Sequence, residues 1–263
     1  MDRIEASERS SEAELHAQHL RERGYTVLEG THTAEQIARF RAALERIHQA
    51  YGAPTPYEPQ TRMLDDKVLV NPTGFVITQL LAMCPELAAE LISPRVVAVV
   101  RRLLGDHAKL ELTGANISDA GRPFFSWHNH IGGIDVEDYR ARLDFPRFER
   151  SQRVIVVSYL HDIDEFGGEL RALPRAIDEP TEPPHDQMAH SWPGQARIHF
   201  PAGSTLIFEQ CTWHAVMPKR TPGQRMFIGA YLKSPEAPKT ATIDESLIGF
   251  SGGDELLRSL LPR

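Results

Sequence analysis

The sequence predicts an α+β fold in which a double-sheet jelly roll carries helices on its outer face. Two observations predict it. Helical periodicity and helix-capping residues fill the first third of the chain. From Lys109 onward, seven or eight short runs rich in β-branched and aromatic residues follow, separated by Gly, Pro and Asp turn residues. Such strands, with the helices gathered at one end of the chain, are typical of a sheet core covered from outside.

Three helices are expected in the first third. "SEAELHAQHLRERG" should end at Gly24, because glycine readily takes the backbone conformation that stops a helix. Thr33 is a candidate N-cap whose capping box is completed by Gln36, and "SPRVVAVVRRLLGD" runs from a Ser93 cap to a Gly105 stop. The second helix should turn one apolar face inward, formed by Ile37, Phe40, Leu44 and Ile47.

The expected strands are "KLELTGANIS", "FFSWHNH", "RVIVVSYL", "ELRAL", "ARIHF", "STLIFE", "TWHAVM" and "RMFIGAYLK". Two Pro-rich segments, 51–72 and 174–195, are too long for simple connections, and such loops often serve as lids or binding loops. We expect a single domain over residues 1–263, made of a helical part at about 11–105, a jelly-roll core at about 109–235 and a tail at 236–263.

Composition narrows the class of protein. A formal net charge of -7, without a dense Lys/Arg stripe, argues against a nucleic-acid partner. Arg101 and Arg102 interrupt the most apolar run far short of a membrane span. The first residues are polar and acidic, unlike a secretory signal, and two cysteines cannot form a disulfide framework. We therefore expect a cytoplasmic protein without a nucleic-acid or membrane partner.

The stretch "WHNH" places His128 and His130 two positions apart in an expected strand. Residues i and i+2 of a strand project from the same face, so both imidazoles can converge on one metal ion. A further ligand is then needed from elsewhere. His214, on the late strand "TWHAVM", is the best candidate among the other histidines.

Arg225 opens the last strand, a short turn after His214. Alternation puts it on one face with Phe227, Gly229 and Tyr231, where the glycine leaves space. A guanidinium is a rigid, permanently charged fork that binds carboxylates with two hydrogen bonds. A metal-binding histidine followed by this arginine predicts a seat for a dicarboxylic acid that chelates the metal.

Five segments, in order, resemble the phytanoyl-CoA dioxygenase family of iron(II)- and 2-oxoglutarate-dependent oxygenases: "GYTVLEGTHTAEQIARFRAAL", "RVVAVVRRLLGDHAKLELTGANIS", "WHNH", "DEFGGELRALP" and "WHAVMPKRTPGQR". The resemblance covers roughly residues 20–235 and implies a cupin-like double-stranded β-helix. It also implies that His128 and His214 bind iron(II), and that Arg225 binds 2-oxoglutarate. Asn116 and Thr113, on the strand before the site, match a region where the family often has a polar residue near the co-substrate.

The family usually closes its metal site with a carboxylate two residues after the first histidine, and this chain has His130 there. Three interpretations follow. In the first, which we favour, His130 is itself a ligand. In the second, Asp135 reaches back from the "GGI" loop. In the third, the carboxylate position is empty and His130 turns aside to bind substrate; some relatives lack the carboxylate and place a halide on the iron, but they have a small residue at this position.

The expected function is oxidation of an unactivated C–H bond, by hydroxylation, desaturation or cyclisation, in a small biosynthetic molecule. The expected cofactors are Fe(II), 2-oxoglutarate and O2. Two other classes stay open. One is a three-histidine dioxygenase that does not use 2-oxoglutarate, against which Arg225 argues. The other is a catalytically silent binding protein on the same fold.

Overall fold

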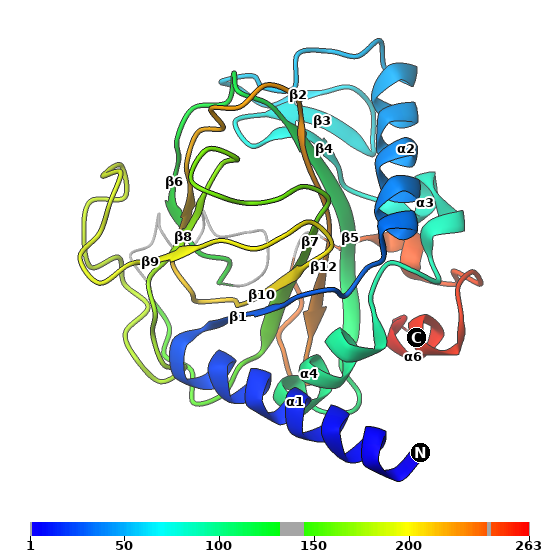
Figure 1. Cartoon of the computed structure of the whole chain (residues 1–263), viewed down its shortest axis with the longest axis vertical. Coiled ribbons are helices and arrows are strands. Elements are labelled where there is room, and N and C mark those ends of the chain that lie inside the picture. The colour runs from blue at the N-terminus through cyan, green and yellow to red at the C-terminus, as the bar shows by residue number, and fades with distance from the viewer. Residues whose placement is uncertain (1, 132–144, 241–242, 263) are drawn as a thin grey trace.

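Two antiparallel sheets face each other and form the jelly roll expected from the sequence (Figure 1). This computed structural model describes residues 2–131, 145–240 and 243–262. The fold class predicted from the sequence, an α+β jelly roll with external helices, is confirmed. Within the described part of the chain, no helix is long and apolar enough to cross a membrane.

The larger sheet has eight strands in the order β1-β10-β7-β12-β5-β4-β3-β2. Its long central strands are β5, β7 and β12, and β12 pairs with β5 along its whole length. The bounds are β1 Tyr25–Leu28, β2 Arg62–Met63, β3 Val68–Asn71, β4 Gly74–Ile77, β5 Lys109–Ser118, β7 Arg153–Tyr159, β10 Thr205–Glu209 and β12 Arg225–Lys233.

The smaller sheet has four strands in the order β6-β11-β8-β9. Its strands are short: β6 Phe125–His128, β8 Leu170–Ala172, β9 Ala196–Ile198 and β11 His214–Val216. Side chains such as Val157 and Phe208 from the larger sheet pack against Leu170 and Val216 from the smaller one. This interior between the two sheets is where the candidate site lies.

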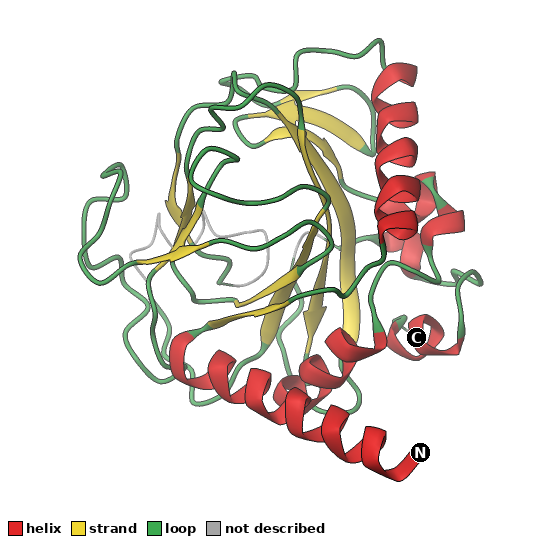
Figure 2. Cartoon of the chain, in the orientation of Figure 1, coloured by secondary structure: helices red, strands yellow, loops and turns green. Residues whose placement is uncertain are grey.

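The helices cover the other face and the lower end of the larger sheet (Figure 2). A second core, which includes Phe40, Val100 and Ile117, fills the space between helices and sheet. The bounds are α1 Asp2–Arg23, α2 Ala34–Ala50, α3 Leu80–Met83, α4 Pro94–Leu104 and α6 Glu255–Leu260, with short 3-10 helices at η1 Pro85–Leu87 and η2 Glu245–Leu247.

The helix boundaries follow the expected capping residues. Thr33 accepts a hydrogen bond from Gln36 N, and the Gln36 side chain accepts from Thr33 N, which completes the capping box. Ser93 caps α4, and Gly24 and Gly105 follow the last residues of α1 and α4 with φ of 77° and 91°. These local signals were sufficient because each cap involves only neighbouring residues.

The first third of the chain also contains strands that periodicity did not predict. β1 adds an edge strand beside β10, and β2, β3 and β4 extend the other edge beyond β5. The Pro-rich segment 51–72 is therefore partly sheet and not a simple loop. We propose that residues 1–263 form one domain, because the pairing of β1 with β10 ties the N-terminal part into the core.

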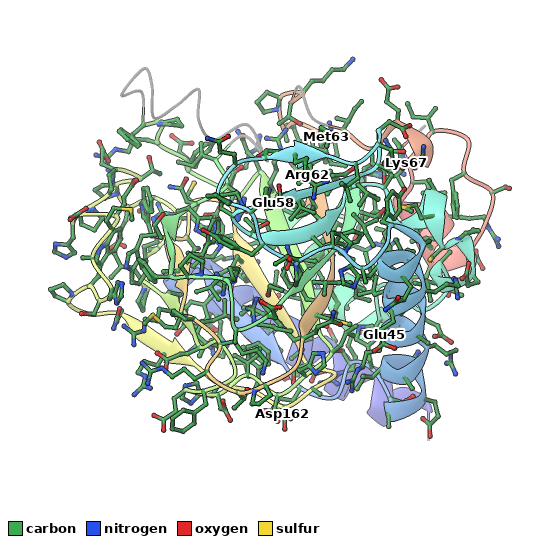
Figure 3. All side chains as sticks on the ribbon, turned by 90° about the horizontal axis from the view of Figure 1, so that it is seen from above. Glu45, Glu58, Arg62, Met63, Lys67 and Asp162 are labelled. Atoms are coloured by element: carbon green, nitrogen blue, oxygen red, sulfur yellow. The ribbon has the colours of Figure 1, made fainter. Side chains whose placement is uncertain are left out.

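The outermost strand β2 carries charged side chains on the molecular surface (Figure 3). Arg62 pairs with Glu58, both partly exposed, and Lys67 pairs with Asp66 nearby. β2 has only two residues, Arg62 and the exposed Met63, and so short an edge strand offers little template for pairing with another chain. This edge of the sheet is thus protected against association.

Candidate metal centre

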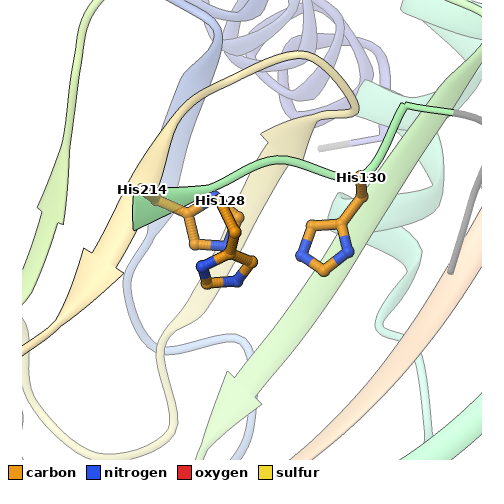
Figure 4. Close-up of side chains that lie close together, drawn as sticks. All are labelled: His128, His130 and His214. Carbon is orange, nitrogen blue, oxygen red and sulfur yellow. The ribbon is translucent and has the colours of Figure 1, made fainter. Parts of the chain in front are cut away.

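His128 and His214 lie side by side on adjacent strands of the smaller sheet (Figure 4). His128 ends β6, His214 begins β11, and the two are direct partners in the antiparallel register. Directly opposite residues in such a pair project from the same face, and their ring centroids are 4.1 Å apart. The fold thus brings together two histidines that are 86 positions apart in the sequence.

Each of these imidazoles has its Nδ1 fixed by a backbone carbonyl. His128 Nδ1 is 2.8 Å from Ser126 O, and His214 Nδ1 is 2.9 Å from Thr212 O. A carbonyl oxygen can only accept, so Nδ1 carries the proton and donates it. The lone pair of each ring therefore lies on Nε2, the tautomer that a metal requires of a histidine held in this way.

His130 lies just beyond the end of β6, where its backbone N–H donates to Gln210 O at 2.7 Å. Its ring centroid is 5.1 Å from that of each of the other two histidines. Its Nδ1 is 3.0 Å from the hydroxyl oxygen of Tyr231 on β12. The three side chains offer nitrogens that all lie within 4.8 Å of one another, a separation that suits ligands of one ion after small ring rotations.

Burial keeps His214 neutral. The ring is 5% exposed, and removal from water lowers the pKa of His214 to about 4. A neutral imidazole has the free lone pair that metal ligation needs at neutral pH. Three such groups form a donor set that suits iron, zinc, copper or nickel.

The histidines open into a cavity of about 230 Å³ between the two sheets. Its walls are mostly apolar and include Ile155, Leu170, Phe208 and Phe227. A few polar or charged side chains interrupt this apolar wall. They are Thr73, Thr78, Asn116, Arg122, His128, His130, Tyr159, His214, Arg225 and Tyr231.

Arg225 lines the cavity from the start of β12, and Phe227, Gly229 and Tyr231 line it from the same strand, as alternation predicted. The guanidinium donates from Nη2 to Tyr159 Oη at 2.9 Å and lies 4.7 Å from the centroid of that ring. Its Nε has no hydrogen-bond partner, although the residue is only 3% exposed. This buried cation is placed to receive an anion.

Gly168 makes room for Arg225. It follows the "EF" of "DEFGGEL" with φ of 92°, and a Cβ built there would lie 3.1 Å from Arg225 Cδ. The pair "GG" connects a bend to strand β8. Its second glycine also permits a close approach to the arginine side chain, which the sequence alone did not indicate.

Arg122 is a site residue that sequence reasoning missed. It lies in the connection between β5 and β6, lines the cavity and is 2% exposed. Burial, and then the charge of Arg225, lower the pKa of Arg122 to about 9, which still leaves it protonated at neutral pH. The signal available was an arginine six positions before His128, which has no characteristic pattern of its own.

The two polar residues expected on β5 face opposite sides of the sheet. Asn116 lines the cavity and donates from Nδ2 to Thr73 Oγ1 at 3.3 Å. Thr113 is fully buried on the helix side, where its hydroxyl donates to Asp244 Oδ2 at 2.9 Å. Residues three positions apart in a strand project from opposite faces of the sheet, so Asn116 lines the cavity and Thr113 does not.

Asp135 and the Gly132-Gly133 turn lie outside the described residues. The tryptophans beside the histidines are packing residues, as expected. Trp127 is fully buried and stacks on Trp192 with ring centroids 4.3 Å apart, and Trp213 joins the same cluster.

Known proteins resemble this chain in sequence and in fold. The family model described as phytanoyl-CoA dioxygenase (PhyH) matches residues 20–227. No curated protein sequence matches the chain. The family match spans the helices and nearly the whole jelly roll, and it includes all three histidines and Arg225.

Three solved structures illustrate the shared fold. The non-heme alpha ketoglutarate dependent carbocyclase SnoK from nogalamycin biosynthesis is 19% identical, with a TM-score of 0.61 over 92% of this chain and 94% of SnoK. HygX from Streptomyces hygroscopicus, with nickel and 2-oxoglutarate bound, is 15% identical, with a TM-score of 0.60 over 84% of this chain and 87% of HygX. EctD from S. alaskensis is 19% identical, with a TM-score of 0.60 over 85% and 77%.

Proposed function

The chain belongs to the phytanoyl-CoA dioxygenase family and is an iron(II)- and 2-oxoglutarate-dependent oxygenase, and we propose that it oxidises an unactivated C–H bond of a small biosynthetic molecule through a three-histidine metal site. Bound iron and 2-oxoglutarate supply O2 activation coupled to decarboxylation of the co-substrate to succinate. The observation that carries the proposal is the convergence of three imidazoles and a buried arginine on one apolar cavity.

We assign the metal to His128, His130 and His214. In His128 and His214, Nδ1 carries the proton and Nε2 is left for the metal. His130 fits the same pattern if its Nδ1–H donates to Tyr231 Oη, because Nε2 is then left for the metal. A neutral imidazole in place of the usual carboxylate leaves one more unit of positive charge on the centre, which favours an anionic ligand there.

We assign the distal carboxylate of 2-oxoglutarate to Arg225. The Tyr159 hydroxyl accepts from Nη2 and holds the fork in place, while Nε remains for a ligand. Asn116 lies on the same wall and can donate to a co-substrate oxygen. The apolar side chains around them exclude water, which strengthens each charged contact.

The substrate is proposed to be a small molecule, and its oxidation would end in hydroxylation, desaturation or cyclisation. Proteins of similar fold have been crystallised with such molecules. The alpha ketoglutarate dependent epimerase SnoN from nogalamycin biosynthesis was crystallised with Fe3+, alpha ketoglutarate and nogalamycin RO, and HygX with nickel, 2-oxoglutarate and hygromycin B. The cavity of about 230 Å³ also has to hold the co-substrate, so we propose that the substrate approaches from its mouth.

The proposal is tested by anaerobic reconstitution with Fe(II), followed by titration with 2-oxoglutarate. The metal-to-ligand absorption band of a chelated 2-oxo acid should appear, and succinate should form when O2 is admitted. His214→Ala should abolish both signals. Oxygen uptake without any need for 2-oxoglutarate would favour the co-substrate-independent dioxygenase, and failure to retain iron would favour a silent binding protein.

A further inference from the structure

Two buried guanidinium groups face the same cavity, and the described residues give neither of them a carboxylate. Arg122 is 2% exposed and Arg225 is 3% exposed. Both line the cavity, and the Nε of each lacks a hydrogen-bond partner. A buried charge without a counter-charge is costly, so such a pair calls for an anionic ligand.

The protein treats its structural arginines differently. Arg153 donates from Nε to Glu111 at 2.9 Å, with both side chains almost fully buried. Arg175 lies 3.4 Å from the buried Glu209. Carboxylates from the chain itself therefore neutralise buried arginines where the role is structural. This contrast marks Arg122 and Arg225 as ligand-binding groups.

The guanidinium groups of Arg122 and Arg225 lie at the same end of the cavity. Arg122 donates from Nη2 to Met217 O at 3.2 Å and from Nη1 to Pro123 O at 3.2 Å. A Cβ built on Gly168 would lie 3.5 Å from that same Met217 oxygen and 3.1 Å from Arg225 Cδ. Backbone carbonyls thus hold Arg122 beside Arg225, and both can reach a single bound group.

We propose that Arg122 and Arg225 form a two-arginine clamp on one carboxylate, the distal carboxylate of a 2-oxo dicarboxylic acid chelated by the metal. The inference rests on the proposed function and deepens it by adding a second binding residue. Arg225 supplies the charge from β12, and Arg122 supplies a second charge and its Nε–H from the β5–β6 connection. Two cations around one carboxylate make the distal acid group the main determinant of co-substrate affinity.

A cycle of ligand and protein changes tests this directly, with binding as the readout. The metal is Mn(II) under anaerobic conditions, and calorimetry measures the affinity for 2-oxoglutarate and for 2-oxopentanoate, which has a methyl group in place of the distal carboxylate. The wild-type protein should prefer 2-oxoglutarate by at least about 100-fold, in line with the loss of one partner from a buried charged pair.

Arg122→Leu should reduce that preference by at least about tenfold, by weakening 2-oxoglutarate binding while 2-oxopentanoate binding stays constant. Arg225→Leu should behave in the same way. Arg220→Leu is the matched control, because Arg220 is an exposed arginine on the same loop as Met217, and it should leave the preference unchanged. Melting temperatures measured alongside show whether each variant is folded.

Two results would overturn the clamp. In the first, Arg122→Leu weakens the binding of both acids equally, which indicates a structural role. In the second, it weakens the binding of neither acid and raises only the KM of the oxidised substrate, which indicates that Arg122 binds an anionic group of that substrate. If Arg122→Leu does not fold, Arg122→Lys keeps the charge but loses the fork, and should still lower 2-oxoglutarate affinity selectively. Equal binding of the two acids by the wild-type protein would likewise overturn the clamp, whereas no binding of 2-oxoglutarate in the presence of Mn(II) would refute the proposed function itself.

Discussion

His130 stands where members of the family usually carry a carboxylate, and in the proposed metal centre this one side chain would set the charge. His128 and His214 hold Nε2 toward the site through carbonyls two residues earlier in the chain. His130 has a hydroxyl partner instead, Tyr231 Oη, from a different sheet. The proposed third ligand is therefore positioned by tertiary structure, whereas the rings of the other two proposed ligands are oriented by neighbouring residues.

Substitution at this position separates the three interpretations of the site. We expect His130→Ala to lower iron affinity markedly and Asp135→Asn to leave it nearly intact, as measured by iron content after anaerobic reconstitution. His130→Asp rebuilds the usual ligand set and should retain iron at least as well as the parent. Full iron occupancy in His130→Ala, with loss of substrate turnover, would instead make His130 a substrate-binding residue.

Tyr231→Phe removes the oxygen that holds His130. Loss of such an outer partner commonly costs about 10–100-fold in metal affinity, and we expect a decrease in that range from competition titration with a chelator. Tyr159→Phe is the complementary variant, because its hydroxyl accepts from Arg225. It should weaken 2-oxoglutarate binding and leave metal affinity unchanged; the reverse pattern would contradict both assignments.

In helix α2, a local capping signal determines which side chains pack into the core. Its capping box fixes the first turn, and this directs Phe40, Leu44 and Ile47 into the core behind the larger sheet. The site lies on the other face of that sheet. Helix α2 thus supports the wall that carries Arg225 and Asn116 without touching the chemistry.

Thr33→Ala should therefore lower stability and leave ligand binding intact. The expected loss is about 0.5–2 kcal/mol in the free energy of unfolding, because one N–H of the first turn loses its acceptor. Urea denaturation measures it, and Thr55→Ala, at an exposed position outside helices and strands, is the control. A larger effect on 2-oxoglutarate affinity than on stability would show that α2 takes part in the site.

For the whole molecule, buried neutral histidines make stability depend on pH. His32 links the start of the α2 region to β7, with Nε2 2.9 Å from Ser158 Oγ. Burial lowers the pKa of His32 to about 4. The unfolded chain, with a pKa near the ordinary value of about 6.5, takes up the proton first as pH falls. Stability is then lost between about pH 6.5 and pH 4.

At pH 5 this histidine should cost about 2 kcal/mol of stability relative to pH 7.5. His32→Gln cannot take up a proton, so its free energy of unfolding should vary less between these pH values. His107→Gln, at an exposed histidine, should leave the pH dependence of the parent unchanged. Equal slopes for the parent and His32→Gln would show that His32 is not buried in its neutral form.

The sequence by itself determined the fold class, the ends of the main helices and the shared face of Arg225, Phe227, Gly229 and Tyr231. Capping boxes and strand alternation involve residues a few positions apart, so they can be read without knowing what lies opposite. Alternation along β5 also places Asn116 and Thr113 on different faces of the sheet.

The tertiary structure decided which side chains share the cavity. His130 and Tyr231 are 101 positions apart, and Arg122 and Met217 are 95 apart. Gly168 leaves room for the side chain of Arg225, which follows it by more than fifty positions in the sequence. Periodicity fixes the face from which a side chain projects, but the partner on that face depends on strand order and register. Those are set by the packing of two complete sheets, which no short stretch of the chain contains.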